Sequence, residues 1–128
     1  MDTFTNHGKT INYTGKIIKP KDINELKNIS KMNYCVLGGG HSFINLGSKK
    51  DCYVDMSNFK NVICINTKQN LLTVESGIKK NEIKNFLKKY KKSIFAVGST
   101  RGQTIGGATA NCVNSPGGFL SHTSDIVK

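Results

Sequence analysis

Leu37-Gly38-Gly39-Gly40-His41-Ser42-Phe43 is the segment from which the rest of this 128-residue chain can be interpreted. It continues the apolar run 34–37, which predicts a buried strand that the glycines end in a tight loop. Glycine adopts positive φ at no steric cost and leaves main-chain N–H groups uncovered. Successive uncovered N–H groups can form a nest for anions such as phosphates. The three glycines alone are equally consistent with a structural turn.

The segments on either side alternate between strand and helix patterns. A strand is predicted over 11–19, and Asp22 with Glu25 has the spacing of a capping box at the start of a short helix reaching 32. After the loop, the sequence predicts a strand over 53–56, a hairpin of 62–66 with 71–75, an amphipathic helix over 78–90 and a strand over 94–97.

A second glycine-rich segment, 98–118, is too long and too patterned for a simple linker. Small residues, hydroxyls and amides dominate it, a composition that suits main chain laid against a large flat ligand. The alternatives are a glycine-rich surface loop and, over its alanine-rich portion, a short buried helix.

Composition excludes several other classes of protein. The net charge of +11 is the balance of 19 basic and 8 acidic residues, and only Arg101 among the basic ones is arginine, so no dedicated nucleic-acid site is predicted. Phosphate-loop, zinc and nucleophilic-hydrolase spacings are missing, and no metal site is expected. The cysteines Cys35 and Cys64 lie in apolar runs and are interpreted as small buried hydrophobes. Without a membrane-length apolar run or a secretory signal, a cytoplasmic protein is the default expectation.

Four motifs in order resemble the FAD-binding, PCMH-type domain of the vanillyl-alcohol oxidase superfamily. They are Phe4-Thr5-Asn6-His7-Gly8, then 38–43, then Val54-Asp55-Met56-Ser57 with Leu72–Gly77, and last Thr104–Asn111. The chain is most similar to the sugar and polyol oxidases of that superfamily, namely aldonolactone oxidase, alditol oxidase and decaprenylphosphoryl-ribose oxidase. The resemblance implies an α+β fold of two α/β subdomains, 1–66 and 67–128, with FAD between them. The second subdomain would be incomplete and the substrate domain absent.

The resemblance also implies a set of cofactor-binding residues. The first loop would grip the pyrophosphate through Leu37, Gly38, Gly39, Gly40, His41, Ser42 and Phe43. The second would line the flavin with Ser99, Thr104, Gly107, Asn111, Cys112, Val113 and Asn114. His41 would form a covalent bond to the 8α carbon of the flavin. The sequence departs from the family at 112–117, where many relatives carry a T-H-G or D-x-H-G motif.

The implied function is the FAD-binding portion of an oxidoreductase that acts on a CH–OH group of a sugar or polyol-like substrate, with hydride passing to flavin N5. No catalytic acid or base is identified in this chain, so a substrate domain or a second chain would have to complete the enzyme. Two alternatives remain open: a UDP-N-acetylenolpyruvylglucosamine reductase-like protein, and a truncated, non-catalytic module that binds a nucleotide or a partner chain.

Overall fold

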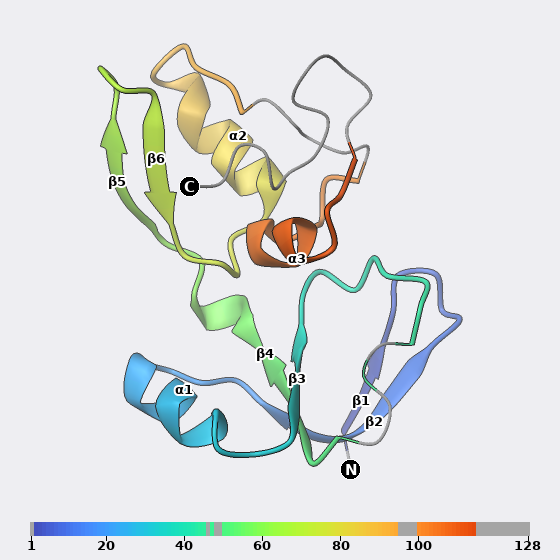
Figure 1. Ribbon diagram of the computed structural model, residues 1–128. Coiled ribbons are helices and arrows are strands. Elements are labelled where there is room, and N and C mark those ends of the chain that lie inside the picture. The colour runs from blue at the N-terminus through green and yellow to red at the C-terminus, as the bar shows by residue number, and fades with distance from the viewer. Residues whose placement is uncertain (1, 46, 48–49, 95–99, 115–128) are drawn as a thin grey trace. The chain divides into compact units, whose positions relative to one another are not determined.

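The computed structural model describes residues 2–45, 47, 50–94 and 100–114 (Figure 1). The chain divides into two compact units, Met1–Asn58 and Phe59–Lys128. The sequence expectation drew its boundary at 66, but strand β5 (Val62–Asn66) pairs with β6 (Leu71–Val74), which places β5 in the second unit. The mixture of sheets and helices confirms the α+β fold class. In the part of the chain that the structure describes, no helix is long and apolar enough to cross a bilayer.

The first unit is a four-stranded sheet with one helix. Its strands are β1 (Asp2–Thr5), β2 (Asn12–Ile18), β3 (Tyr34–Leu37) and β4 (Cys52–Asp55), in the order β1-β2-β4-β3. β1 is antiparallel to β2, whereas β4 lies between β2 and β3 and is parallel to both. β1 was not expected from the sequence, while β2, β3 and β4 confirm the predicted strands to within two residues at each end.

Helix α1 (Ile23–Ile29) begins at the predicted cap. The Asp22 carboxylate accepts hydrogen bonds from the N–H groups of Asn24 and Glu25 at 2.8 and 2.9 Å. Glu25 accepts from the N–H of Lys21 at 2.8 Å, one residue before the position that a capping box uses. The helix ends three residues before the expected limit, where the Ser30 hydroxyl donates to a carbonyl of the last turn.

Each face of the sheet carries its own apolar cluster. On one face Tyr13, Leu37 and Tyr53 are buried, and the two tyrosine rings lie 5.5 Å apart, centroid to centroid. On the other, Cys52 and Val54 pack with Ile29 of α1. The prediction of β3 as a buried strand is wrong in part: β3 is an edge strand in which Tyr34 is 39 % and Val36 53 % exposed.

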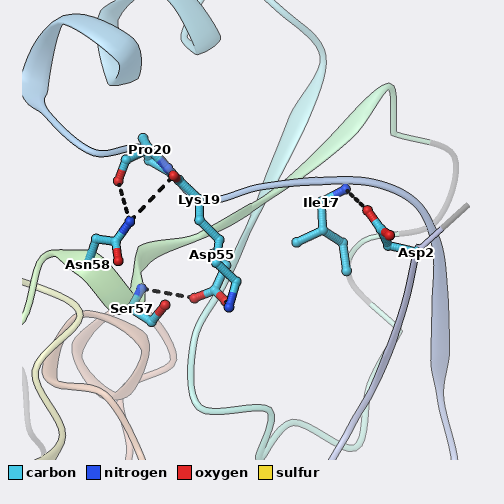
Figure 2. Close-up of polar contacts among 7 residues, drawn as sticks. All are labelled: Asp2, Ile17, Lys19, Pro20, Asp55, Ser57 and Asn58. Atoms are coloured by element: carbon cyan, nitrogen blue, oxygen red, sulfur yellow. Dashed lines mark hydrogen bonds and ion pairs between the residues drawn. The ribbon is translucent and has the colours of Figure 1, made fainter.

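Figure 2 includes the contacts that join the end of β2 to the end of β4 and to the residues that follow it. The Lys19 ammonium forms an ion pair with the Asp55 carboxylate at 3.0 Å, and the same carboxylate accepts the N–H of Ser57 at 2.9 Å. The Asn58 side chain donates to the carbonyls of Pro20 and Lys19 at 3.1 and 3.4 Å. Met56–Asn58 forms the short 3-10 helix η1, so these bonds hold the exit of the first unit.

The second unit comprises the β5–β6 hairpin, α2 (Lys80–Lys88) and α3 (Ile105–Ala110). Its core consists of Ile78, Ile83, Leu87 and Ile105. The hairpin and the amphipathic helix confirm their predictions. Cys64, in contrast, is exposed, because a register shift between Val62 and Cys64 interrupts the alternation of the strand. The strand expected over 94–97 falls almost entirely on 95–99, outside the described residues.

Candidate functional site

The first glycine loop leaves the sheet at the carboxyl ends of its parallel strands. Leu37, the last residue of β3, is in register with Asp55, the last residue of β4, and Ile18 of β2 with Val54. In open α/β sheets, ligands bind in the crevice outside this edge. The loop therefore starts where a binding site is expected.

Asn6 connects this loop to the turn between β1 and β2. Its side chain is only 3 % exposed, and its Nδ2 donates to the Ser42 carbonyl at 2.9 Å. Its Oδ1 accepts the N–H groups of Thr10 and Ile11 at 2.8 and 3.0 Å. One buried amide thus fixes both the hairpin turn and the path of the loop. Asn6 belongs to the first of the four family motifs, but a single Asn in a polar turn gives no sign of a partner 36 residues away.

Close packing reinforces this connection. The N–H of His7 donates to the Gly40 carbonyl at 2.7 Å. Gly40 has φ +72°, and a Cβ there would also lie 3.0 Å from the Phe4 ring. A Cβ on Gly8 would lie 2.7 Å from the Phe43 ring. Farther along the loop, the Tyr53 hydroxyl donates to the Gly47 carbonyl at 2.8 Å.

The fixed loop keeps main-chain donors available. Among the described residues, none accepts a hydrogen bond from the N–H groups of Gly39, Gly40 or Ser42. Gly39, Gly40 and Ser42 are half-buried residues, and each of their N–H groups can donate one hydrogen bond to a ligand. A phosphate oxygen would satisfy them, so the loop fits the pyrophosphate of the expected cofactor.

His41 is half-buried and lies against a second imidazole. The rings of His7 and His41 are 4.6 Å apart, centroid to centroid, with an interplanar angle of 40°. Phe43 follows with 71 % of its surface exposed, and Ser42 Oγ accepts the N–H of Ile44 at 3.3 Å in a local turn. Among the described residues, no group of three or more His, Cys, Asp or Glu could hold a metal ion.

Two ionisable groups lie on the strands at the base of the loop. Partial burial acts to raise the pKa of Asp55, but hydrogen bonds from Lys19 and Ser57, with the charge of Lys19, hold that pKa below its usual value. Asp55 is therefore ionised at neutral pH, and Lys19 compensates its charge near the start of the first glycine loop. Burial raises the pKa of the Cys35 thiol, against an opposing effect of Lys50, so this thiol stays protonated.

The second glycine-rich segment contains a helix, the alternative that the alanine-rich stretch left open. Thr104 is the N-cap of α3, and its hydroxyl accepts the N–H of Gly107 at 3.2 Å. The N–H of Ile105 donates to the Ile78 carbonyl and that of Gly106 to the Ser76 carbonyl, both at 2.9 Å. At the start of α3, unlike in the first loop, the N–H groups of Ile105, Gly106 and Gly107 already have acceptors within the chain. The contribution of this segment to a ligand would therefore be shape.

Residues 111–113 complete a Schellman motif after α3. The N–H of Cys112 donates to the Thr109 carbonyl at 3.1 Å and that of Val113 to the Ala108 carbonyl at 2.9 Å. Cys112 has φ +47°, a conformation that glycine normally supplies. Asn111 and Asn114 are exposed, and Asn111 Nδ2 donates to the Gly107 carbonyl at 2.8 Å.

Each expected set of cofactor residues stays together in one unit. Leu37 to Phe43 form the braced loop of the first unit, and Thr104 to Asn114 form the helix and cap of the second. Ser99 lies outside the described residues. The roles of Asn6 and His7 in holding the first loop could not be recognised from the sequence.

Comparison with known proteins identifies the family of this chain. The model of a family described as "FAD binding domain" matches residues 15–128. That match confirms FAD as the cofactor of the domain type; it carries no information on covalent attachment. No curated protein sequence matches this chain.

Three solved structures show the same fold. Cholesterol oxidase from Brevibacterium sterolicum superposes with a TM-score of 0.73 at 18% identity, over 94% of this chain and 24% of its own. A variant of the same oxidase gives 0.72 at 16% identity, over 87% and 24%. Alkyldihydroxyacetonephosphate synthase gives 0.67 at 19% identity, over 77% and 21%. The present chain therefore spans less than a quarter of each of these relatives.

Proposed function

This chain belongs to the FAD binding domain family, and we propose that it is the flavin-holding part of an FAD-linked oxidoreductase. The observation that carries the proposal is the first glycine loop. It presents the N–H groups of Gly39, Gly40 and Ser42, for which no described residue is an acceptor, at the carboxyl edge of the sheet. Asn6 fixes the loop in that conformation before any ligand binds.

The main chain of this loop would hold the cofactor through its pyrophosphate. Two phosphates carry negative charge that N–H donors stabilise without a bulky side chain in the way. Lys19 supports the same role, because its ammonium neutralises Asp55 at the base of the loop. Bound FAD would supply hydride acceptance at flavin N5, and the protein would orient it and adjust its electronics.

His41 is the residue we propose for a covalent link to the flavin 8α carbon. Imidazole is nucleophilic when neutral, and its pKa lies near working pH. The bond would replace one hydrogen of the imidazole nitrogen and one of the flavin methyl group, both leaving as protons, and an external oxidant such as dioxygen would have to take up the two electrons released. The ring of His7, 4.6 Å from that of His41, restricts the directions in which His41 can point.

We also propose that the substrate is a sugar or polyol-like molecule, oxidised at a CH–OH group. The resemblance of the loop motifs to sugar and polyol oxidases supports this class of substrate. The residues that exchange the substrate proton would come from a further domain or a second chain, since this chain spans less than a quarter of its solved relatives.

Incubation with FAD, followed by gel filtration and acid precipitation, tests cofactor binding and the covalent link separately. We expect a yellow protein with flavin absorbance, part of which stays with the acid pellet. Failure to take up added FAD would refute the flavin-holding function.

His41→Ala separates the two claims. This variant should bind FAD with all of the flavin released by acid. His122→Ala removes the third histidine of the chain, serves as the control for loss of an imidazole, and should retain the pellet-bound flavin. Flavin that stays covalent in His41→Ala would show that another residue forms the bond.

A further inference from the structure

Lys80 is a fully buried lysine in the second unit. It is the first residue of α2, and its side chain has no exposed surface. Its Nζ donates to Gln103 Oε1 at 2.9 Å. Among the described residues, no carboxylate forms an ion pair with it. Burial of an ammonium group against a neutral partner is costly.

The environment of Lys80 agrees with that cost. Burial lowers the pKa of the Lys80 ammonium, and no charged neighbour opposes the shift. Ordinary packing is better served by an apolar side chain of similar volume, such as Met or Leu. A buried amine at this position calls for a role that an apolar side chain lacks.

Lys80 forms two hydrogen bonds with Gln103, which indicates that it positions this residue. The N–H of Lys80 donates to the Gln103 carbonyl at 2.9 Å, and its Nζ donates to the Gln103 side chain. The next residue, Thr104, forms a bridge with Lys79 and caps α3. Lys80 therefore fixes the residue from which the second glycine segment enters its helix.

The chain that follows Gln103 packs closely against Ser76 at Gly106. The N–H of Gly106 donates to the Ser76 carbonyl, and a Cβ on Gly106 would lie 2.9 Å from that carbonyl oxygen. This close approach exists only if the chain enters the helix along one path. Gln103 sets the entry point, and two bonds from Lys80 determine where Gln103 lies.

We propose that Lys80 is a positioning residue of the flavin site: its buried amine orients Gln103 and thereby holds the Thr104–Gly107 turn in the shape that the cofactor requires. The proposal rests on the proposed function, because the turn is one of the two segments assigned to the flavin. Lys80 itself contacts no cofactor in this scheme. Its contribution is pre-organisation, which raises affinity by reducing the ordering cost of binding.

Three variants and a control test it. Lys80→Met removes the amine and keeps the length of the side chain, while Gln103→Leu removes its acceptor. The double variant lacks both groups. Lys84→Met changes an exposed lysine of the same helix and serves as the control.

The first measurement is FAD affinity by flavin fluorescence titration. Each single variant should raise the FAD dissociation constant by roughly tenfold, ~1.4 kcal/mol. The double variant should be no weaker than the singles, since both remove one interaction. Lys84→Met should match the parent. FAD affinity unchanged in Lys80→Met, or losses that add in the double variant, would overturn the proposal.

The second measurement is amide hydrogen exchange at 105–107 in the ligand-free chain, which does not depend on FAD. We expect faster exchange in Lys80→Met and Gln103→Leu than in Lys84→Met. If the parent binds no FAD but exchange is faster in Lys80→Met and Gln103→Leu, the flavin function is refuted, while the Lys80–Gln103 bond is shown to hold the turn. If exchange in these variants equals that of Lys84→Met, the positioning role of Lys80 is refuted. Should Lys80→Met not fold, Gln103→Asn, which shortens the acceptor by one methylene, gives the same reading.

Discussion

Replacement of Asn6 is the most direct test of how the first glycine loop is held. In Asn6→Ala, three main-chain groups lose their partner: the N–H groups of Thr10 and Ile11 and the carbonyl of Ser42. Each lost hydrogen bond costs about 1 kcal/mol. We expect the free energy of unfolding to fall by roughly 2–3 kcal/mol, somewhat less than the sum because water can reach the exposed Thr10.

Urea unfolding followed by tyrosine fluorescence measures this loss, since the chain has no tryptophan and Tyr13 and Tyr53 lie in the core of the same unit. Asn12→Ala is the matched control. Asn12 lies on the same hairpin, is exposed, and accepts one hydrogen bond from the Thr5 hydroxyl at 2.8 Å. It should change stability by no more than about 0.5 kcal/mol. If Asn6→Ala lowers the free energy of unfolding no more than Asn12→Ala does, Asn6 does not hold the loop.

Asn6→Asp isolates the bond to the loop. The carboxylate keeps an acceptor for Thr10 and Ile11 but directs an oxygen at the Ser42 carbonyl, 2.9 Å from the atom it replaces. Burial and that repulsion would raise the folded pKa of the new carboxyl above its unfolded value near 3.9, against the smaller opposing effect of the N–H groups of Thr10 and Ile11. The protonated form is then favoured by folding, so stability should fall as pH rises from about 4 through the raised pKa. A stability difference from the parent that does not depend on pH would contradict this account.

Three further outcomes follow from particular residues. The pKa of Asp55 is lowered in the folded chain, so the ionised carboxylate stabilises the fold above about pH 4, and this stabilisation is lost as the pH falls through the folded-state pKa. Acid unfolding of Asp55→Asn, compared with that of the parent, should therefore lack the loss of stability that comes from protonating Asp55. Lys80 also has a lowered pKa, so the unfolded state binds more protons between the folded value and about 10.4; stability should rise with pH in that window, and Lys80→Met should abolish the rise. Cys112→Gly should raise the melting temperature, because φ +47° costs a non-glycine residue about 1 kcal/mol; a lower melting temperature would show that the thiol makes a compensating contact.

Local patterns predicted most of the fold. Alternation and turn chemistry identified β2, β4 and the β5–β6 hairpin, and Asp22 marked the start of α1, because these features depend on neighbours in the sequence. The burial of β3 was misjudged. An apolar run in the sequence does not reveal whether a strand lies at the centre or at the edge of its sheet, and sheet order is set by distant segments.

In the site, too, features that depend on sequence neighbours could be predicted, whereas contacts between distant segments could not. The glycines of the first loop could be recognised because positive φ and uncovered N–H groups are properties of glycine itself. The hydrogen bond from Asn6 that holds the loop could not be recognised, since Asn6 contacts Ser42 only after the sheet has formed. Helical spacing puts Lys80 on the same face of α2 as Ile83 and Leu87, but only the arrangement of the folded chain places its amine beside Gln103.

The position of Asn6 in the chain has a practical consequence. The family match begins at residue 15, after β1 and the turn that contains Asn6 and His7. A chain trimmed to that limit would keep every glycine of the first loop and lose the two residues that hold it. Such a shortened protein would carry the complete family signature and still bind FAD poorly. Boundaries for expression or for transplanting this domain should therefore be drawn from the contacts of the loop, with residues 2–14 included.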